Sequence, residues 1–329
     1  MNKLKKYYDS IYCKSNILAF LILMVVASIA FADKNFLSTN NIVNILLKAA
    51  KDGGMLAFGM TFVILLGQID LSAGAVYAFS GVVMGVVGQI NPILGIIAGL
   101  MTGVVTGYLL GFMVTKLRIH SWIASLAMMF AVRGMISIVA HASVPVEHEV
   151  LRFASIKFLK GFLGVKAGIS ILVPILFALT FVCMYIGRCT KYGMGLYAVG
   201  GNKEAARMMG IDVDKITMRA YQCSGIIASI SGVLLASSSG SATLSAGNVY
   251  ETYAIAMCAI GGIKLSGGQG TFGGTFFGVM IYFVINTIFT YLNGVSVNWQ
   301  SVIMGALVLV SVALQSEVFS GLKLKAKKK

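Results

Sequence analysis

The sequence predicts an all-α protein: a polytopic bundle of transmembrane helices that forms a single transmembrane domain over residues 1–329. Three observations predict this class: 58% of the 329 residues are apolar, only 11% are charged, and apolar residues are spread along the whole chain. Typical soluble domains carry about 25% charged residues, so this chain lacks the polar surface that water requires. Its 38 glycines fit helices that pack closely in lipid.

Apolar segments along the chain predict about ten membrane spans, since a helix needs roughly 20 apolar residues to cross a bilayer. Seven segments are expected to be single spans, one to be two short or broken spans, and one to be a span that ends in glycine-rich sequence. The seven are Ile17–Phe31, Ile93–Thr115, Trp122–Ala140, Ala167–Ile186, Met218–Ser237, Phe272–Tyr291 and Ser301–Gln315; the broken pair is Gly53–Val87, and the last is Tyr253–Gly270.

The basic residues predict orientation. A net charge of +15 would suggest a nucleic-acid partner in a soluble protein, but here lysines and arginines sit at the chain ends and in polar gaps. Such a bias marks the cytoplasmic side of a membrane protein, so no nucleic-acid partner is expected and both termini are predicted to be cytoplasmic. Segment 188–217 is then inside, and segment 141–166 is outside.

A short motif occurs twice. Gly67–Gly74 and Gly261–Gly268 share the pattern G-x-I-x-L-S-x-G, and each follows an unusually short apolar segment. Paired glycine-interrupted segments in two halves of a chain point to a transport pathway. The pattern therefore predicts two related halves, parallel or inverted, although coincidence among glycine-rich spans is the alternative.

Only two acids lie within or beside apolar membrane stretches, Asp70 and Glu251. A charge at a helix centre is costly, so both side chains should face protein or water. Asp70 has two open roles: it lines a pathway, or it caps the helix that restarts after it. The candidate residues of the pathway or its gate are Asp70, Ser72, Glu251, Tyr253, Lys264 and Ser266.

The inner segment contains a predicted short helix, Lys203–Met209. Asn202 is a good N-cap, Glu204 favours the helix dipole, and Gly210 is a natural stop. Small and soft side chains on this helix suit docking to a partner, whereas the alternative is an amphipathic connector lying on lipid. The candidate coupling residues are Asn202, Glu204, Ala205, Ala206, Met208, Met209 and Gly210.

The motif Glu204-Ala205-Ala206-x-x-x-Gly210 resembles the EAA–G coupling motif of bacterial ABC-importer permeases. Longer strings, in the same order from about residue 36 to 315, resemble the ribose/galactose-type monosaccharide permease family. They are GMTFVILLGQIDLSAGAV (59–76), IASLAMMFAVRGM (123–135), YAVGGNKEAARMMGIDV (197–213), GSATLSAGNVYETYAIA (240–256), GGIKLSGGQGTFGGTFFG (261–278) and GVSVNWQSVIMGALVLVSVAL (294–314).

This resemblance implies a multi-pass protein of the bacterial inner membrane that translocates a monosaccharide and has no catalytic, metal or cofactor site of its own. It implies a dimer with a second permease copy or paralogue, two cytoplasmic ATPases that carry the ATP and Mg²⁺, and an extracytoplasmic sugar-binding protein. We expect the binding protein to dock near Asn40–Lys51 and segment 141–166. The alternative function is an ion-gradient-driven secondary transporter of a small polar solute, which needs no ATPase.

The sequence departs from the family pattern near the expected outer gate and pathway. Tyr253 replaces an acid that often follows Tyr250-Glu251, Leu244 replaces a usual proline, and Lys264 stands where a small polar residue is common. The string Leu265–Gln269 spells the LSGGQ signature of ABC ATPases, but the chain has no G-x-x-x-x-G-K-[ST] phosphate loop. The glycine-rich permease pattern explains this string, and we expect no ATPase activity in the chain.

Overall fold

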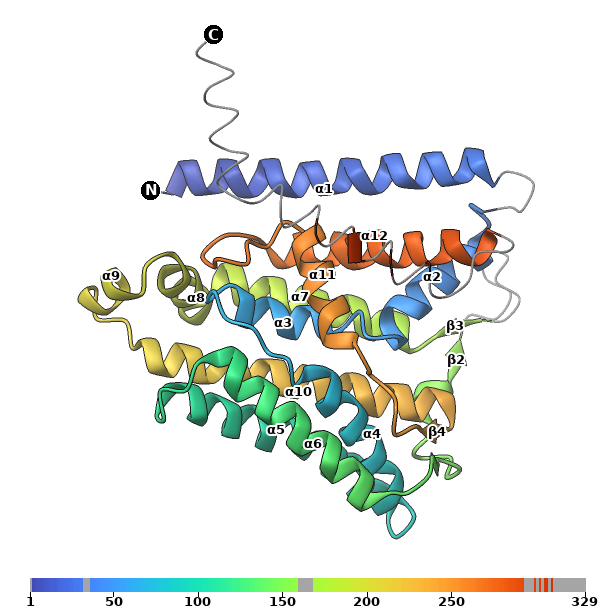
Figure 1. The fold of residues 1–329 in the computed structure, drawn as a ribbon. Coiled ribbons are helices and arrows are strands. Elements are labelled where there is room, and N and C mark those ends of the chain that lie inside the picture. Colours follow the sequence, from blue (N-terminus) through green and yellow to red (C-terminus); the bar gives the residue numbers. More distant parts are fainter. Residues whose placement is uncertain are drawn as a thin grey trace.

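The computed structural model describes residues 2–31, 36–158 and 168–292, together with the single positions 299, 302, 305, 306 and 309. The described part is a bundle of helices with two pairs of very short strands (Figure 1). The helices are α1 Asn2–Ala30, α2 Thr39–Lys51, α3 Leu56–Ile64, α4 Ala73–Gly88, α5 Pro92–Thr115, α6 Ser121–Val139, α7 Leu172–Cys189, α8 Lys191–Gly201, α9 Lys203–Met208, α10 Val213–Ser239, α11 Tyr250–Ile260 and α12 Phe272–Tyr291.

The long helices run roughly along one direction, so the bundle has two distinct ends (Figure 1). Helices α8 and α9 lie at one of them, which we call the α9 end, and α1 begins at this end too. The strands lie at the opposite end, which we call the strand end. There β1 (Val144–Pro145) pairs with β4 (Ser241–Ala242), and β2 (Lys157–Phe158) pairs with β3 (Ile169–Ser170).

Five helices of the described part are long and apolar enough to cross a membrane: α5, α6, α7, α10 and α12. Helix α5, with 24 residues, is about 36 Å long, enough for a hydrocarbon core of roughly 30 Å. The predicted all-α membrane bundle is confirmed. The count of ten spans and the two related halves stay predictions, and the expected span Ser301–Gln315 lies largely outside the described residues.

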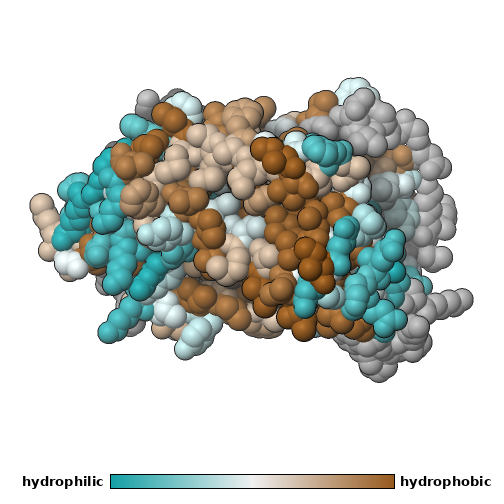
Figure 2. Space-filling model, turned by 90° about the horizontal axis from the view of Figure 1, so that it is seen from below, coloured by the Kyte–Doolittle hydropathy of each residue, from teal (hydrophilic) through white to brown (hydrophobic). Residues whose placement is uncertain are grey.

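The outer surface of α5 and α6 is apolar. Large side chains such as Ile97, Phe112, Phe130 and Ile138 are exposed there. Figure 2 shows this face as a hydrophobic region with hydrophilic residues gathered toward both ends of the molecule. An apolar surface of this extent between two polar ends is what a lipid bilayer requires.

Helix α10 forms the centre of the bundle and packs against α3, α4 and α5. Glycines allow its closest contact: a Cβ atom on Gly103 of α5 would collide with the carbonyl oxygen of Gly225 of α10, and the reverse holds for Gly225. Backbones that approach this closely gain van der Waals contact, which is the main attraction between helices in lipid. Helices α3, α4 and α5 are therefore arranged around α10.

Several boundaries differ from the sequence prediction. Helix α7 begins at Leu172 rather than Ala167, because residues 169–170 pair with β2 first. Helix α10 begins at Val213 rather than Met218, since the Asp212 side chain accepts a hydrogen bond from the Lys215 amide and caps a polar first turn. Segment 40–51, expected only as an outer segment, forms α2 and packs against α7 and α12.

Candidate translocation and coupling site

The break predicted between residues 53 and 87 is present. Helix α3 ends at Ile64, α4 begins at Ala73, and Gly67 between them has a φ of 69°. Such a left-handed conformation is cheap only for glycine, so this residue allows the chain to leave α3 abruptly. The segment after it carries Asp70 and Ser72 into the interior of the bundle, where both side chains are buried.

Asp70 is 2% exposed and its carboxylate holds three hydrogen bonds. Oδ1 accepts from the Ser72 amide at 2.9 Å and from the Ser72 hydroxyl at 2.6 Å, and Oδ2 accepts from the Ser224 hydroxyl at 2.6 Å. Ser224 belongs to α10. Asp70 thus fixes the residue that precedes α4 and ties the broken span to the central helix, which goes beyond the local cap expected from sequence.

Glu251 lies on the other side of the start of α4. A Cβ atom on Gly74 would collide with Glu251 Oε2, and this oxygen is buried without a hydrogen-bond partner among the described residues. Asp70 and Arg133 both lie within electrostatic range of Glu251. The Arg133 guanidinium donates to the carbonyl oxygens of Leu244 and Ala246. The structure therefore brings Asp70, Ser72 and Glu251 together.

The two copies of the repeated motif are in contact with each other. The Gly268 amide donates a 2.8 Å hydrogen bond to the Leu65 carbonyl oxygen at the end of α3. A Cβ atom on Gly267 would lie 2.6 Å from the Gly67 nitrogen, and one on Gly67 would lie 2.9 Å from the Ser266 oxygen. The backbones of the two segments are in direct contact, so the two copies of the motif lie together at one junction in the fold.

The end of α8 completes this junction. A Cβ atom on Gly200 would collide with the Leu65 carbonyl oxygen, and it would lie 2.6 Å from the Gly268 nitrogen. The Tyr197 hydroxyl donates to the Gly270 carbonyl oxygen at 3.0 Å. We call Gly67, Gly200, Gly267 and Gly268 the glycine junction. It connects the broken span, the loop after α11 and the residues just before α9.

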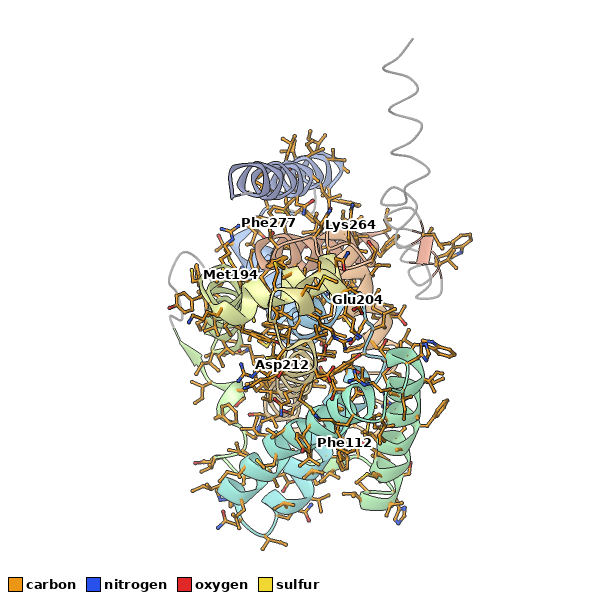
Figure 3. All side chains as sticks on the ribbon, turned by 90° about the vertical axis from the view of Figure 1, so that its left-hand side faces the viewer. Phe112, Met194, Glu204, Asp212, Lys264 and Phe277 are labelled. Atoms are coloured by element: carbon orange, nitrogen blue, oxygen red, sulfur yellow. The ribbon has the colours of Figure 1, made fainter. Side chains whose placement is uncertain are left out.

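Two predicted pathway residues lie here, apart from Asp70 and Glu251. Lys264 and Ser266 belong to the loop that forms the junction, and Figure 3, which looks onto the α9 end, labels Lys264 beside Glu204. The expectation that Lys264 flanks an outer gate stays a prediction; in the structure its loop lies against the ends of α3 and α8. Tyr253 takes another place, in a row of tyrosine rings described below.

Helix α9 has the predicted caps. The Asn202 side chain accepts from the Ala205 amide at 2.9 Å, and Gly210 has a φ of 78°. The Ile211 amide donates back to the Ala206 carbonyl oxygen, which closes the helix end one residue earlier than predicted, at Met208. Met208 is 89% exposed and Met209 65%, whereas Ala206 is fully buried within its own chain.

Ion pairs that the sequence did not indicate lie beside α9. Arg118, in the turn between α5 and α6, makes two hydrogen bonds to the Asp214 carboxylate at 2.9 and 2.8 Å. Arg207 of α9 approaches the same carboxylate at 4.0 Å. Arg118 is 96 residues from Asp214 in sequence, so spacing alone gave no signal for their pairing. The sequence also gave no signal for Ser224 as the partner of Asp70, because the two residues are 154 positions apart. A buried carboxylate nevertheless needs a hydrogen-bond donor of this kind.

Residues 41–312 match the family model described as "Branched-chain amino acid transport system / permease component". The chain belongs to this family. It is a transport permease, and α9 and the broken span described above lie within the matched region. This assignment supports the permease prediction and gives no support to the secondary-transporter alternative.

Several similar proteins are named as sugar import permeases. The permease is 38% identical to the ribose import permease protein RbsC of Bacillus subtilis over 90% of each chain. It is 31% identical to RbsC of Escherichia coli K12, over 95% of this chain and 97% of that one. It is 33% identical to the galactose/methyl galactoside import permease protein MglC of the same strain, over 96% and 98%. No solved structure matches the chain.

Proposed function

We propose that this permease is the membrane subunit of an ATP-driven importer that carries a monosaccharide of the ribose, galactose or xylose type. The observation that carries the substrate class is the likeness to ribose and galactose permeases over nine-tenths or more of both chains. The family description names branched-chain amino acids, but the individual relatives cited above are named for sugars. The substrate is therefore a sugar, delivered by an extracytoplasmic binding protein.

The energy comes from separate ATPase subunits that bind ATP and Mg²⁺, and α9 is where they dock. Three features support this role: α9 lies at one end of the bundle, it exposes Met208 and Met209, and Arg207 is tied to the body of the protein through Asp214. Flexible methionine side chains fill irregular gaps in a partner's surface. Arg207 lies near Asp214 of α10 and Ala206 is buried in its own chain, so movement of α9 should be passed to the rest of the bundle.

The bundle lies in the inner membrane with the α9 end and both termini in the cytoplasm. The excess of lysine and arginine in segment 188–217 and the position of the start of α1 at the α9 end support this orientation. The strand end then faces the binding protein. Two permease copies, or one copy and a paralogue, form the transport unit. This unit alternates between a conformation open to the outside and one open to the cytoplasm, and the sugar crosses the membrane during the change.

An uptake experiment tests the substrate class. Cells lacking their own ribose and galactose permeases would receive this chain with its ATPase and binding protein, and uptake of labelled ribose, galactose, xylose and leucine would be measured. We expect uptake of at least one sugar and no uptake of leucine. Uptake of leucine alone would contradict the proposal and show that the substrate is a branched-chain amino acid, as the family description names.

A further inference from the structure

A polar groove lies between α2 and α12. Its volume is about 460 Å³, which falls within the range of roughly 300–1,000 Å³ for small-molecule sites. It lies in the half of the bundle nearer the strand end, where α12 finishes and α2 begins (Figure 1). The lining residues are Asn41, Asn44, Leu47, Lys48, Lys51 and Asp52 of α2 and its C-cap, and Thr287, Thr290 and Tyr291 of α12.

The groove has a composition that lipid would not tolerate. Lys48 and Lys51 lie on the α2 face that lines it, together with Asn44, in a helix that packs between apolar helices. Lysine side chains that line a groove between packed helices need water or a polar partner around their charges. The polar stripe of α2 therefore indicates that the groove is filled with water or a polar solute.

The groove offers both kinds of hydrogen-bonding group. Lysine ammonium groups donate, the Asp52 carboxylate accepts, and the Asn44 amide does both. The Thr287 hydroxyl donates to the Phe283 carbonyl oxygen at 2.8 Å, so its own oxygen still accepts. Asp52 lies within electrostatic range of both lysines, which offsets part of their charge. A mixed set of this kind matches a solute whose hydroxyl groups both donate and accept.

A row of four tyrosines continues inward from the groove. The ring centroids of Tyr282 and Tyr253 are 5.6 Å apart, those of Tyr253 and Tyr250 are 6.0 Å apart, and those of Tyr250 and Tyr77 are 5.6 Å apart. The Tyr77 hydroxyl donates to the Lys51 carbonyl oxygen at 2.7 Å, which joins the row to the groove.

The turn after α2 is the second link between groove and row. Asp52 lies within electrostatic range of Tyr77, Tyr250 and Tyr282. A Cβ atom on Gly53 would lie 2.6 Å from the Tyr250 ring, so that ring rests against the backbone of the turn. Glu251, next in sequence to Tyr250, then reaches the start of α4 near Asp70. Polar and aromatic groups are thus continuous from the groove to the broken span.

We propose that the α2–α12 groove is a binding site for a neutral monosaccharide, which occupies it before moving along the tyrosine row toward Glu251 and Asp70. The inference rests on the proposed function for the class of solute. Sugar hydroxyls bond to the amide, hydroxyl and charged groups of the groove, and an apolar sugar face packs on the Tyr291 ring that lines it. Affinity is weak, since a transport site must release its solute.

Protection of a cysteine tests occupancy directly. Asn44→Cys would be introduced into the full chain, reconstituted with its ATPase in nanodiscs and labelled with a polar thiol reagent, with and without ribose or galactose. At a sugar concentration about ten times the dissociation constant, labelling should slow about tenfold, because only a tenth of the grooves stay empty. Asn40→Cys is the matched control: Asn40 is exposed on the same helix outside the groove, and its labelling should not change.

The outcomes separate the inference from the proposed function. Uptake of a sugar by the unaltered importer, with no protection of Asn44→Cys by that same sugar, would overturn the groove site and leave the proposed function intact. Protection by ribose 5-phosphate but not by ribose would overturn the neutral class. Equal slowing at Asn40→Cys would mean a general change of conformation, which also contradicts a site in the groove.

A transport measurement adds a second readout. Thr287→Val keeps the side-chain shape and removes the hydroxyl, and Asn44→Leu removes the amide. Because the binding protein sets the apparent affinity for sugar, these variants should lower the maximal uptake rate about tenfold and leave the half-saturating concentration unchanged. Thr180→Val serves as the control, because the buried Thr180 hydroxyl also donates to a carbonyl oxygen of its own helix, but Thr180 does not line the groove. Normal maximal rates in both groove variants, at equal amounts in the membrane, would contradict the proposal.

Discussion

The hydroxyl of Ser224, in the middle of α10, donates a 2.6 Å hydrogen bond to Oδ2 of Asp70 in the broken span, 154 residues earlier in the chain. The bond is buried, and it connects the segment that interrupts α3 and α4 to the helix around which the bundle packs. A buried carboxylate that loses a donor is left poorly compensated. The position of the broken span therefore depends on this pair.

Removing the Ser224 hydroxyl should destabilise the permease and slow transport. Ser224→Ala leaves Asp70 Oδ2 without a donor, at a cost of about 1–3 kcal/mol, and should lower the midpoint of thermal unfolding in detergent. Ser231→Ala is the matched control, because Ser231 is buried on the same helix but bonds only to the Ile227 carbonyl oxygen of its own helix. Equal decreases of the unfolding midpoint in both variants would show that the Ser224–Asp70 hydrogen bond adds no stability beyond that of an ordinary buried serine.

Neutralising Asp70 tests the effect of its charge on uptake while the shape of the side chain is kept. In Asp70→Asn the Ser72 bonds can persist and the new amide can donate to the Ser224 oxygen, so the protein should still insert and fold. Uptake should nevertheless fall, because the charge near Glu251 at the start of α4 is lost. Uptake by this variant would be compared with the amount of protein in the membrane. Unchanged uptake per molecule would reduce Asp70 to a structural anchor.

The glycine junction should pass motion of α9 to the broken span. Gly200→Ala places a methyl group on the Leu65 carbonyl oxygen, so α8 must move away from the end of α3. We expect ATP hydrolysis to continue while sugar uptake falls severalfold. Gly201→Ala is the matched control, since nothing lies within 4 Å of a Cβ atom there. Parallel loss of uptake in both variants, or normal uptake in Gly200→Ala, would contradict a coupling role for the junction.

Docking of the ATPase should depend on Met208, which is 89% exposed. Met208→Glu adds a charge to the proposed contact without disturbing the core, so the amount of ATPase that co-purifies with the permease should drop about tenfold or more. Met208→Leu preserves an apolar side chain and should retain the ATPase. Ala206→Glu would be a poorer test, because Ala206 is buried in its own chain and this change would also disturb α9.

The features that could be predicted from the sequence are those decided by residues close together in the chain. Periodic apolar segments and local caps predicted the bundle, the break near Asp70 and the Asn202 and Gly210 ends of α9, since each is decided by neighbours in sequence. The Ser224 bond, the Arg118–Asp214 pair and the meeting of the two glycine loops join residues far apart in the chain. Helix α2 was missed because its polar stripe faces a groove, which hydropathy alone reports as an exposed segment.

The energy source is the most direct test of the central claim that this chain is the permease of an ATP-driven sugar importer. The permease, its ATPase and its binding protein would be reconstituted in vesicles loaded with ATP and Mg²⁺, and sugar uptake would be measured before and after a protonophore collapses the proton gradient. Our account predicts uptake that needs ATP and continues unchanged after the collapse. Uptake that stops with the gradient at constant ATP would contradict it.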